Sequence, residues 1–357
     1  MASHKNHHFV PKVHLKSFST HADGNAINLF NIKSGRLIPD APTKHQCAKN
    51  YFYGKDGALE KMFGEIEGRY AEAVRKASGH TFDESDLVWM RLFMVLQYGR
   101  TEVAAQQIKL FFEKSAALTF RGRSLSESER PPLDPHQIVL QALRSLKGLT
   151  PSLKDLHFCI LENHTKIQFV TSDNPLINTN RFYCQKIGED TWGAISAGAL
   201  FILPLTPRLT ACLFDPGVYA VKSHKGYADL KKETDVLALN EMQYLNAAEN
   251  VYFSEVQDGE RIAGEFGPIS SRRVKELARL TEFLAVAMPD GRDRIVPLKP
   301  GMDEEKYDSK YIMYNVPRPI PARWPSILPF RMRLIAYSNG SAAGYVRHAE
   351  WLKKMPE

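Results

Sequence analysis

The sequence predicts an α+β fold, with a helical core, a small mixed or antiparallel sheet and an extended, proline-rich C-terminal tail. Three observations predict it. Two long segments place apolar residues at helical spacing, and several short runs are rich in β-branched and aromatic residues. The stretch PRPIPARWPSILP at 317–329 contains too many prolines for a helix or a central strand.

The first half of the chain supplies the predicted helical core. Apolar residues recur at every third or fourth position from Leu59 to near Gly79, which predicts an amphipathic helix. A second helix is predicted to begin after Asp83 or Ser85 as N-cap and to continue to about residue 112. Its first half is apolar nearly all round, so we expect it to be the central helix. Further helices are predicted at 135–146 and at about 234–248.

The predicted strands are short and scattered. Residues 26–38 predict a hairpin with its turn at Ser34 and Gly35. Other β-rich runs lie at 156–163, 166–172, 200–205, 209–214 and 250–255. Together they predict the small sheet.

The C-terminal hundred residues are predicted to form an extension. We expect a domain at 1–256 and an extension at 257–357, with a helix at 274–287 and a basic proline-rich tail that serves as a lid or a partner arm. Residues 121–135 combine charge, serine and proline, which predicts a surface loop or linker.

Composition excludes several classes of protein. Hydrophobic residues make up 43% of the 357 residues and charged residues 24%, which is typical of globular proteins and not of disordered ones. No run of 18 apolar residues and no apolar signal core is present, so we expect a cytoplasmic protein with no membrane contact. The four isolated cysteines predict neither a zinc knuckle nor a disulfide framework. Dinucleotide, P-loop, zincin and hydrolase-elbow motifs are absent from the sequence.

Positive charge is concentrated at the two ends of the chain. Residues 1–50 hold seven basic and two acidic residues, and residues 310–357 hold eight basic and two acidic residues. If the ends meet in the fold, they would form a surface suited to nucleic acid or to a phosphorylated ligand. If they do not, the charge serves solubility only.

Arg100 ends the apolar part of the second predicted helix, three residues after Gln97. We therefore expect its guanidinium to be buried and to pair with a carboxylate. A buried guanidinium without a carboxylate costs about 3 to 5 kcal/mol, so we expect it to pair with Glu67, Glu60 or Asp173. The pair either locks two helices together or lines a cleft and binds a substrate phosphate or carboxylate.

Asp173 and Asn174 directly follow an apolar strand and precede a proline. A carboxylate at a strand end could bind a metal ion or act as a general base. The alternative is an Asx turn that closes the strand.

Half of the twelve histidines lie in the first 45 residues, and their spacing does not match zinc-binding motifs: His4, His7, His8, His14, His21 and His45. His8 or His7 could carry a proton or contact a phosphate near neutral pH.

Eight short motifs occur in an order that resembles the bacterial DUF4238 family. They are NHHFVPKVHLKSFS at 6–19, YFYG at 51–54, LEKMFGEIEG at 59–68, LQYGRT at 96–101, FVTSDNP at 169–175, LPLTP at 203–207, LN at 239–240 and NVYFS at 250–254. The resemblance covers residues 5–255 and implies a domain of unknown function. Its matching positions are His7, His8, Pro11, Glu60, Glu67, Arg100, Asp173, Asn174 and Pro175.

Two hypotheses from different classes follow. The first is a hydrolase, a nuclease or nucleotide hydrolase dependent on Mg²⁺ or Mn²⁺, in a toxin or phage-defence setting. In it Asp173 and Glu67 bind metal or activate water, Arg100 holds phosphate and His8 transfers a proton, while His7, Gln97 and Asn174 bind substrate. The second is a non-catalytic module that binds nucleic acid or a protein, in which the Arg and Glu residues are structural.

Overall fold

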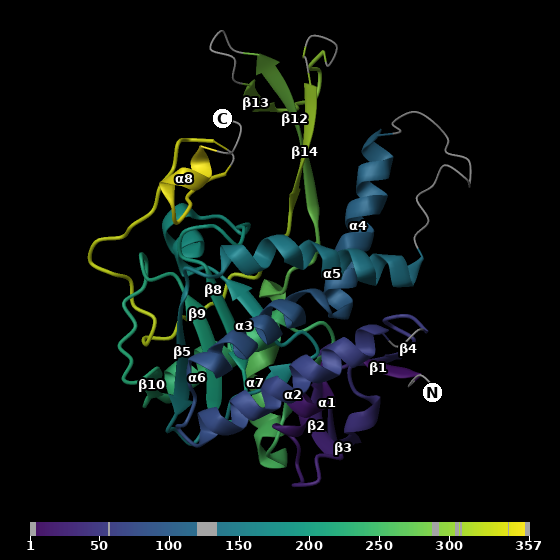
Figure 1. Cartoon of the computed structure of the whole chain (residues 1–357), viewed down its shortest axis with the longest axis vertical. Helices are drawn as coiled ribbons and strands as arrows, with labels where there is room; N and C mark the ends of the chain where they lie inside the picture. The colour runs from purple at the N-terminus through teal and green to yellow at the C-terminus, as the bar shows by residue number, and fades with distance from the viewer. Residues whose placement is uncertain are drawn as a thin grey trace.

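The computed structural model describes residues 5–55, 58–119, 134–287, 293–303, 307, 309–341 and 343–353. Its fold is α+β, as the sequence predicts. Figure 1 shows a body of sheets covered by helices, from which a separate small sheet and helix α4 project at one end. Of the loop predicted at 121–135, residues 121–133 lie outside the described ranges, as does His4.

A five-stranded sheet forms the centre of the body. Its order is β10-β5-β9-β8-β7, antiparallel except for the parallel pair β10 and β5. The strands are β5 (His157–Asn163), β7 (Ile177–Thr179), β8 (Leu200–Pro204), β9 (Leu209–Phe214) and β10 (Tyr227–Leu230). Strands β8 and β9 are apolar along almost their whole length because both faces of the sheet are covered.

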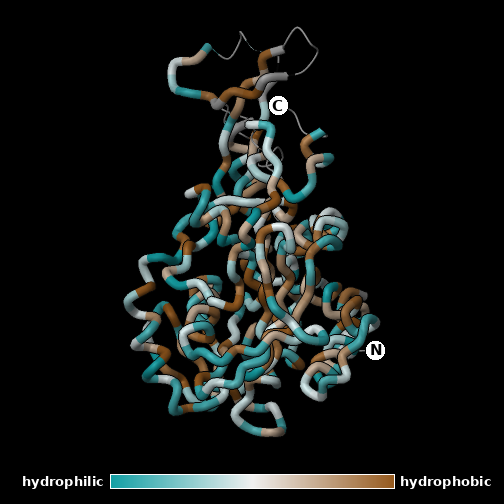
Figure 2. Tube along the Cα trace, turned by 90° about the vertical axis from the view of Figure 1, so that its left-hand side faces the viewer, coloured by the Kyte–Doolittle hydropathy of each residue, from teal (hydrophilic) through white to brown (hydrophobic). Residues whose placement is uncertain are grey.

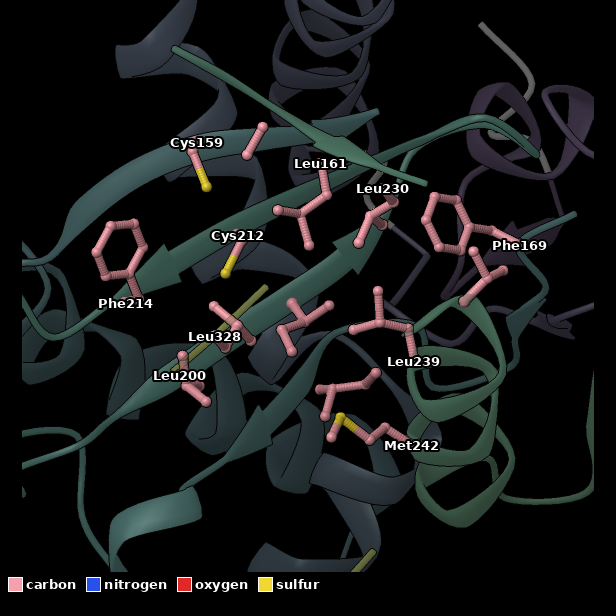
Figure 3. Packing of buried hydrophobic residues seen from close by; sticks show 14 of the residues in the cluster. Cys159, Leu161, Phe169, Leu200, Cys212, Phe214, Leu230, Leu239, Met242 and Leu328 are labelled. Atoms are coloured by element: carbon pink, nitrogen blue, oxygen red, sulfur yellow. The ribbon is translucent and has the colours of Figure 1, made fainter. Parts of the chain in front are cut away.

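Successive residues of each strand point to opposite faces, so one sheet contributes to two cores. Cys159, Leu161 and Cys212 face α6 (Glu233–Asn246), with Leu239 and Met242 opposite them, as Figure 3 shows. The residues between them, such as Ile160 and Leu213, pack against the helices on the other face. These helices are α2 (Ala58–Ser78), α3 (Glu84–Gly99) and α5 (Pro135–Ser152).

The second predicted helix is in fact two helices. Asp83 caps α3 as predicted, in a capping box with Asp86. The helix then ends at Gly99 instead of continuing to 112, and α4 (Glu102–Thr119) begins after two intervening residues. The break arises because Arg100 turns into a buried cluster, while Oγ1 of Thr101 accepts a hydrogen bond from the backbone N–H of Ala104 in the new helix.

A second, four-stranded antiparallel sheet has the order β3-β2-β11-β6. It contains the predicted hairpin, formed by β2 (Ala26–Asn31) and β3 (Arg36–Pro42), together with β11 (Asn250–Phe253) and β6 (Thr171–Ser172). The strand predicted at 166–172 is reduced to β6. The residues before β6 do not pair with a neighbouring strand in the described ranges. The backbone N–H of Phe169 donates to the carbonyl of Pro207, and that of Val170 donates to Oδ1 of Asn240.

The N-terminal segment adds β1 (Asn6–His8), paired with β4 (Ala48–Asn50), and the short helix α1 (Lys12–Lys16). After β11 the chain forms α7 (Gly259–Phe266). The helix predicted at 274–287 is wrong, because residues 279–287 form β12 (Arg279–Ala287). That strand pairs on both sides, with β13 (Asp293–Pro297) and β14 (Ser309–Asn315), and this pairing outweighs its helical spacing. The sheet extends away from the body in both views (Figures 1 and 2).

The C-terminal tail is largely extended, as predicted, and lies against the body before ending at α8 (Ala349–Leu352). Leu328 and Val346 are fully buried in it. Ser326 bonds to Asp235 of α6, and Arg347 makes a bidentate ion pair with Asp155. The tail therefore completes the core of the body.

All four cysteines carry free thiols, and three of them are buried. Among the described residues, no helix has the length and apolar character needed to cross a membrane.

Candidate functional site

Arg100 lies at the end of α3 and is 1% exposed. Its Nη1 donates to Oε1 of Glu67 on α2 at 2.7 Å, its Nε donates to the hydroxyl of Tyr53 at 3.1 Å, and its Nη2 donates to the carbonyl of His8 at 2.8 Å. The guanidinium also lies 4.6 Å from the ring centre of Phe63. Of the three predicted partners the structure selects Glu67, and every nitrogen of the guanidinium is directed at the protein.

The predicted substrate-binding residues near Arg100 are also internal. Nε2 of Gln97 donates to the carbonyl of Phe9 at 3.0 Å. Nδ1 of His7 accepts the backbone N–H of Tyr53, so the ring proton of a neutral His7 is on Nε2, which has no partner among the described residues. Burial and nearby Lys12 lower the pKa of His8 to about 4, so this ring is neutral near pH 7. In this form the ring has one nitrogen that can accept a proton.

Asp173 organises the backbone between α6 and β11. Its two carboxylate oxygens accept the N–H groups of Ala248, Glu249 and Asn250 at 2.7, 2.8 and 2.9 Å. Burial raises the pKa of Asp173 to about 6, although these three hydrogen bonds lower it in part.

Asn174 continues the same connection. Its Nδ2 donates to the carbonyl of Asn246, and Nδ2 of Asn246 donates back to the carbonyl of Asn174. The SDNP segment thus ties β6 to the end of α6. These bonds reach residues 246–250 and do not form the Asx turn that the sequence offered as an alternative.

A cleft of about 450 Å³ lies where five parts of the chain meet. It is lined by the segment around β4, the junction of α3 and α4, the SDNP segment, the turn between α6 and β11, and the start of the tail. Asp173 and Asn174 belong to its wall, whereas His7, His8, Glu67, Gln97 and Arg100 do not. The expected convergence of His8, Glu67, Arg100 and Asp173 in one cleft does not occur among the described residues.

The cationic residues of the cleft come from three regions: the basic N-terminal region, the basic C-terminal region and the segment after β11. Lys49 belongs to the basic N-terminal region and pairs with Glu102, while Arg318 belongs to the basic C-terminal region. Arg273 donates to the carbonyls of Tyr244, Ala247 and Ala248 and so closes the end of α6.

Arg318 and Tyr98 form a pair that sequence reasoning missed. Nη2 of Arg318 donates to the hydroxyl of Tyr98 at 2.7 Å, and the guanidinium lies against the rings of Tyr98 and Trp192. Among the described residues, Nε of Arg318 has no hydrogen-bond partner and no carboxylate lies within ion-pair distance of the guanidinium. Burial would raise the pKa of Tyr98, but the charge and hydrogen bond of Arg318 outweigh it and lower that pKa.

The sequence contained signals for both residues. Tyr98 lies in the LQYGRT motif beside Arg100, and Arg318 lies in the proline-rich tail that carries the C-terminal excess of positive charge. Their proximity could not be inferred, because more than 200 residues separate them in the chain.

A family model matches residues 6–256, which is most of the chain. The chain is a member of the DUF4238 family. This family is described as a protein of unknown function, so DUF4238 membership assigns no activity to the cleft. Most of the cleft wall lies within the DUF4238 region, and residues 273, 274, 277 and 316–319 complete it from outside that region. No curated protein and no solved structure shows a significant match to the chain.

Proposed function

We propose that the chain is a binding module that takes a phosphate-bearing ligand of nucleotide size, a nucleotide or the end of a nucleic-acid strand, in the 450 Å³ cleft. The observation that carries this proposal is that Lys49 and Arg318, from the two basic ends of the chain, line the same hollow. Its volume lies within the range of small-molecule sites, which is roughly 300–1,000 Å³.

The state of Arg318 supports an anionic ligand. The guanidinium of Arg318 pairs with no carboxylate among the described residues, so its positive charge is available to a ligand. Its planar N–H donors match the geometry of a phosphate group. Among the described residues, the ammonium group of Lys49 is paired only with the partly exposed Glu102, and such pairs are worth about 0–1 kcal/mol. Its ammonium group can therefore turn toward a ligand at little cost.

The test is a titration of the full chain with ATP, ADP and short single-stranded RNA and DNA. Binding is measured by fluorescence polarisation at several salt concentrations. Arg318→Gln should weaken binding about tenfold or more, because a hydrogen bond to a charged group contributes about 1.5–3 kcal/mol. Arg333→Gln is the matched control, since it removes the same charge from an exposed position of the same tail.

The control should bind like the wild type, and affinity for the strands should fall steeply as salt rises. Equal binding by the Arg318 and Arg333 variants, or no dependence on salt, would rule out this cleft as the phosphate site.

Hydrolysis of the bound ligand is a second proposal, supported by the position of Asp173 in the wall of the same cleft. The experiment is incubation with RNA, DNA and nucleotides in the presence of Mg²⁺ or Mn²⁺, beside the Asp173→Asn variant. Absence of turnover by the wild type would refute hydrolysis, and equal turnover by both proteins would remove Asp173 from the mechanism.

A further inference from the structure

We propose that a cluster outside the cleft binds a divalent transition-metal ion of the Zn²⁺ class. The cluster, called here the edge cluster, consists of Glu162, His164 and Asp229, whose ligand atoms gather at one place, and of His80, which contacts Glu162 from one side. Imidazole and carboxylate groups are common protein ligands for zinc. The proposal is independent of the function proposed for the cleft.

The backbone brings three of these residues together at one edge of the central sheet. Strands β5 and β10 pair in parallel with Asp229 in register with Glu162. The backbone N–H of His164 donates to the carbonyl of Leu230 at 3.0 Å, which continues the ladder past the end of β5. Because side chains two residues apart point to the same face, Glu162, His164 and Asp229 lie side by side.

The fourth residue comes from the connection between α2 and α3. The ring of His80 packs against Tyr227 with their centres 4.5 Å apart, and the hydroxyl of Tyr227 donates to the carbonyl of Ala77 at the end of α2. This contact fixes the helix end on β10 and holds His80 beside Glu162.

The distances between ligand atoms suit a metal site. Nε2 of His80 is 3.2 Å from Oε1 of Glu162, and Nε2 of His164 is 3.4 Å from Oδ1 of Asp229. One ligand atom from each of Glu162, His164 and Asp229 lies within 4.8 Å of the others. Tetrahedral zinc with bonds of about 2.0–2.1 Å places its ligand atoms about 3.3 Å apart, so small side-chain movements would complete a coordination shell.

Electrostatics also favours a cation here. Two carboxylates directly opposite each other on paired strands repel. Lys231 lies 3.2 Å from Oδ2 of Asp229 and compensates in part, but it is 73% exposed and leaves Oδ1 facing Nε2 of His164. A divalent ion would neutralise both carboxylates while the imidazoles remain uncharged ligands. The two histidines and Asp229 are about half exposed, which leaves an open path for the ion.

The experiment is isothermal titration of the full, untagged chain with ZnCl₂, with circular dichroism to check that each variant is folded. The variants are His164→Ala and Asp229→Asn, and the matched control is His224→Ala. This control removes an exposed imidazole just before β10, outside the edge cluster.

The wild type and the control should each bind one equivalent of zinc with the same affinity. The affinity of the two cluster variants should be at least tenfold lower. The melting temperature of the wild type should also rise with zinc, because an ion that binds only the folded state stabilises it. If the wild type binds no zinc, or if His164→Ala binds it as tightly as the wild type, the proposal is wrong. In the second case the zinc would be bound by other histidines, such as those near the N-terminus.

Discussion

Nη1 of Arg100 donates a hydrogen bond to Oε1 of Glu67 at 2.7 Å and thereby joins the end of α3 to the middle of α2. The guanidinium is sealed from solvent, whereas the carboxylate side chain is 25% exposed. The pair therefore acts mainly on stability. It also explains why the chain turns at Arg100 instead of continuing one helix.

Removal of Glu67 should strongly destabilise the protein. Glu67→Ala leaves a buried guanidinium without its carboxylate, which typically costs about 3 to 5 kcal/mol of unfolding free energy. Urea denaturation measures the change. The exposed pair of Arg75 and Glu72 on the same helix is the control, and Glu72→Ala should leave the urea midpoint unchanged. A Glu67 variant as stable as the wild type would contradict the structural role of this pair.

Asp173 should make stability fall as pH rises from about 4 to about 6. Burial raises the pKa of Asp173 to about 6 in the folded protein, so between these values the folded state holds a proton that the unfolded chain has released. This contribution is fully present below the unfolded pKa and is lost as pH passes the folded one. It changes by at most about 1.4 kcal/mol per pH unit.

The measurement compares urea denaturation of the wild type and Asp173→Asn across that range. The stability of the wild type relative to the variant should decrease up to about pH 6 and then stay constant. A difference that does not vary with pH would show that the pKa of Asp173 is not raised.

His14 should act in the opposite direction. It is fully buried, its Nδ1 lies 2.9 Å from the hydroxyl of Tyr70 and its Nε2 lies 2.8 Å from Oγ1 of Thr171. Burial lowers the pKa of His14 to about 3, so below about pH 6.5 the unfolded chain gains a proton that the folded protein excludes. Stability should therefore fall on acidification through this window. His14→Gln does not titrate, and its unfolding free energy should show a smaller slope between pH 6.5 and 4; equal slopes would disprove this role.

Gly99 should not accept a side chain. A Cβ atom there would lie 2.7 Å from Cδ2 of Leu146, in the contact between α3 and α5. Gly99→Ala should lower the unfolding free energy by about 1–3 kcal/mol through overpacking. Gly148→Ala in α5 meets no atom within 4 Å and should raise it by about 0.5–1 kcal/mol. Thermal denaturation of both variants checks the contrast, which would fail if both shifted in the same direction.

Features set by neighbouring residues could be predicted from the sequence. Residues close in sequence determine three such features: the helix from Leu59, the N-cap at Asp83 and the hairpin turn at Gly35. Features set by distant residues could not. The helix break at Arg100 depends on Glu67 and Tyr53, and β12 is a strand because two other strands pair with it.

The candidate sites follow the same division. The position of Asp173 after a strand predicts a functional role, and Asp173 lies in the cleft wall. Arg318 comes from a tail whose course over the body no local pattern reveals. The edge cluster is assembled from three separated segments, and only the register between β5 and β10 places Glu162 beside Asp229.

The burial of Leu328 and Val346 has a consequence for biosynthesis. The interior of the body stays open until residues 328 and 346 have left the ribosome, because their side chains help to fill it. A nascent chain that stops before residue 328 would expose apolar surface, and chains of this kind are targets for chaperones and proteases. A closed core thus requires synthesis through residue 346, and a stop codon before position 328 would leave the core incomplete.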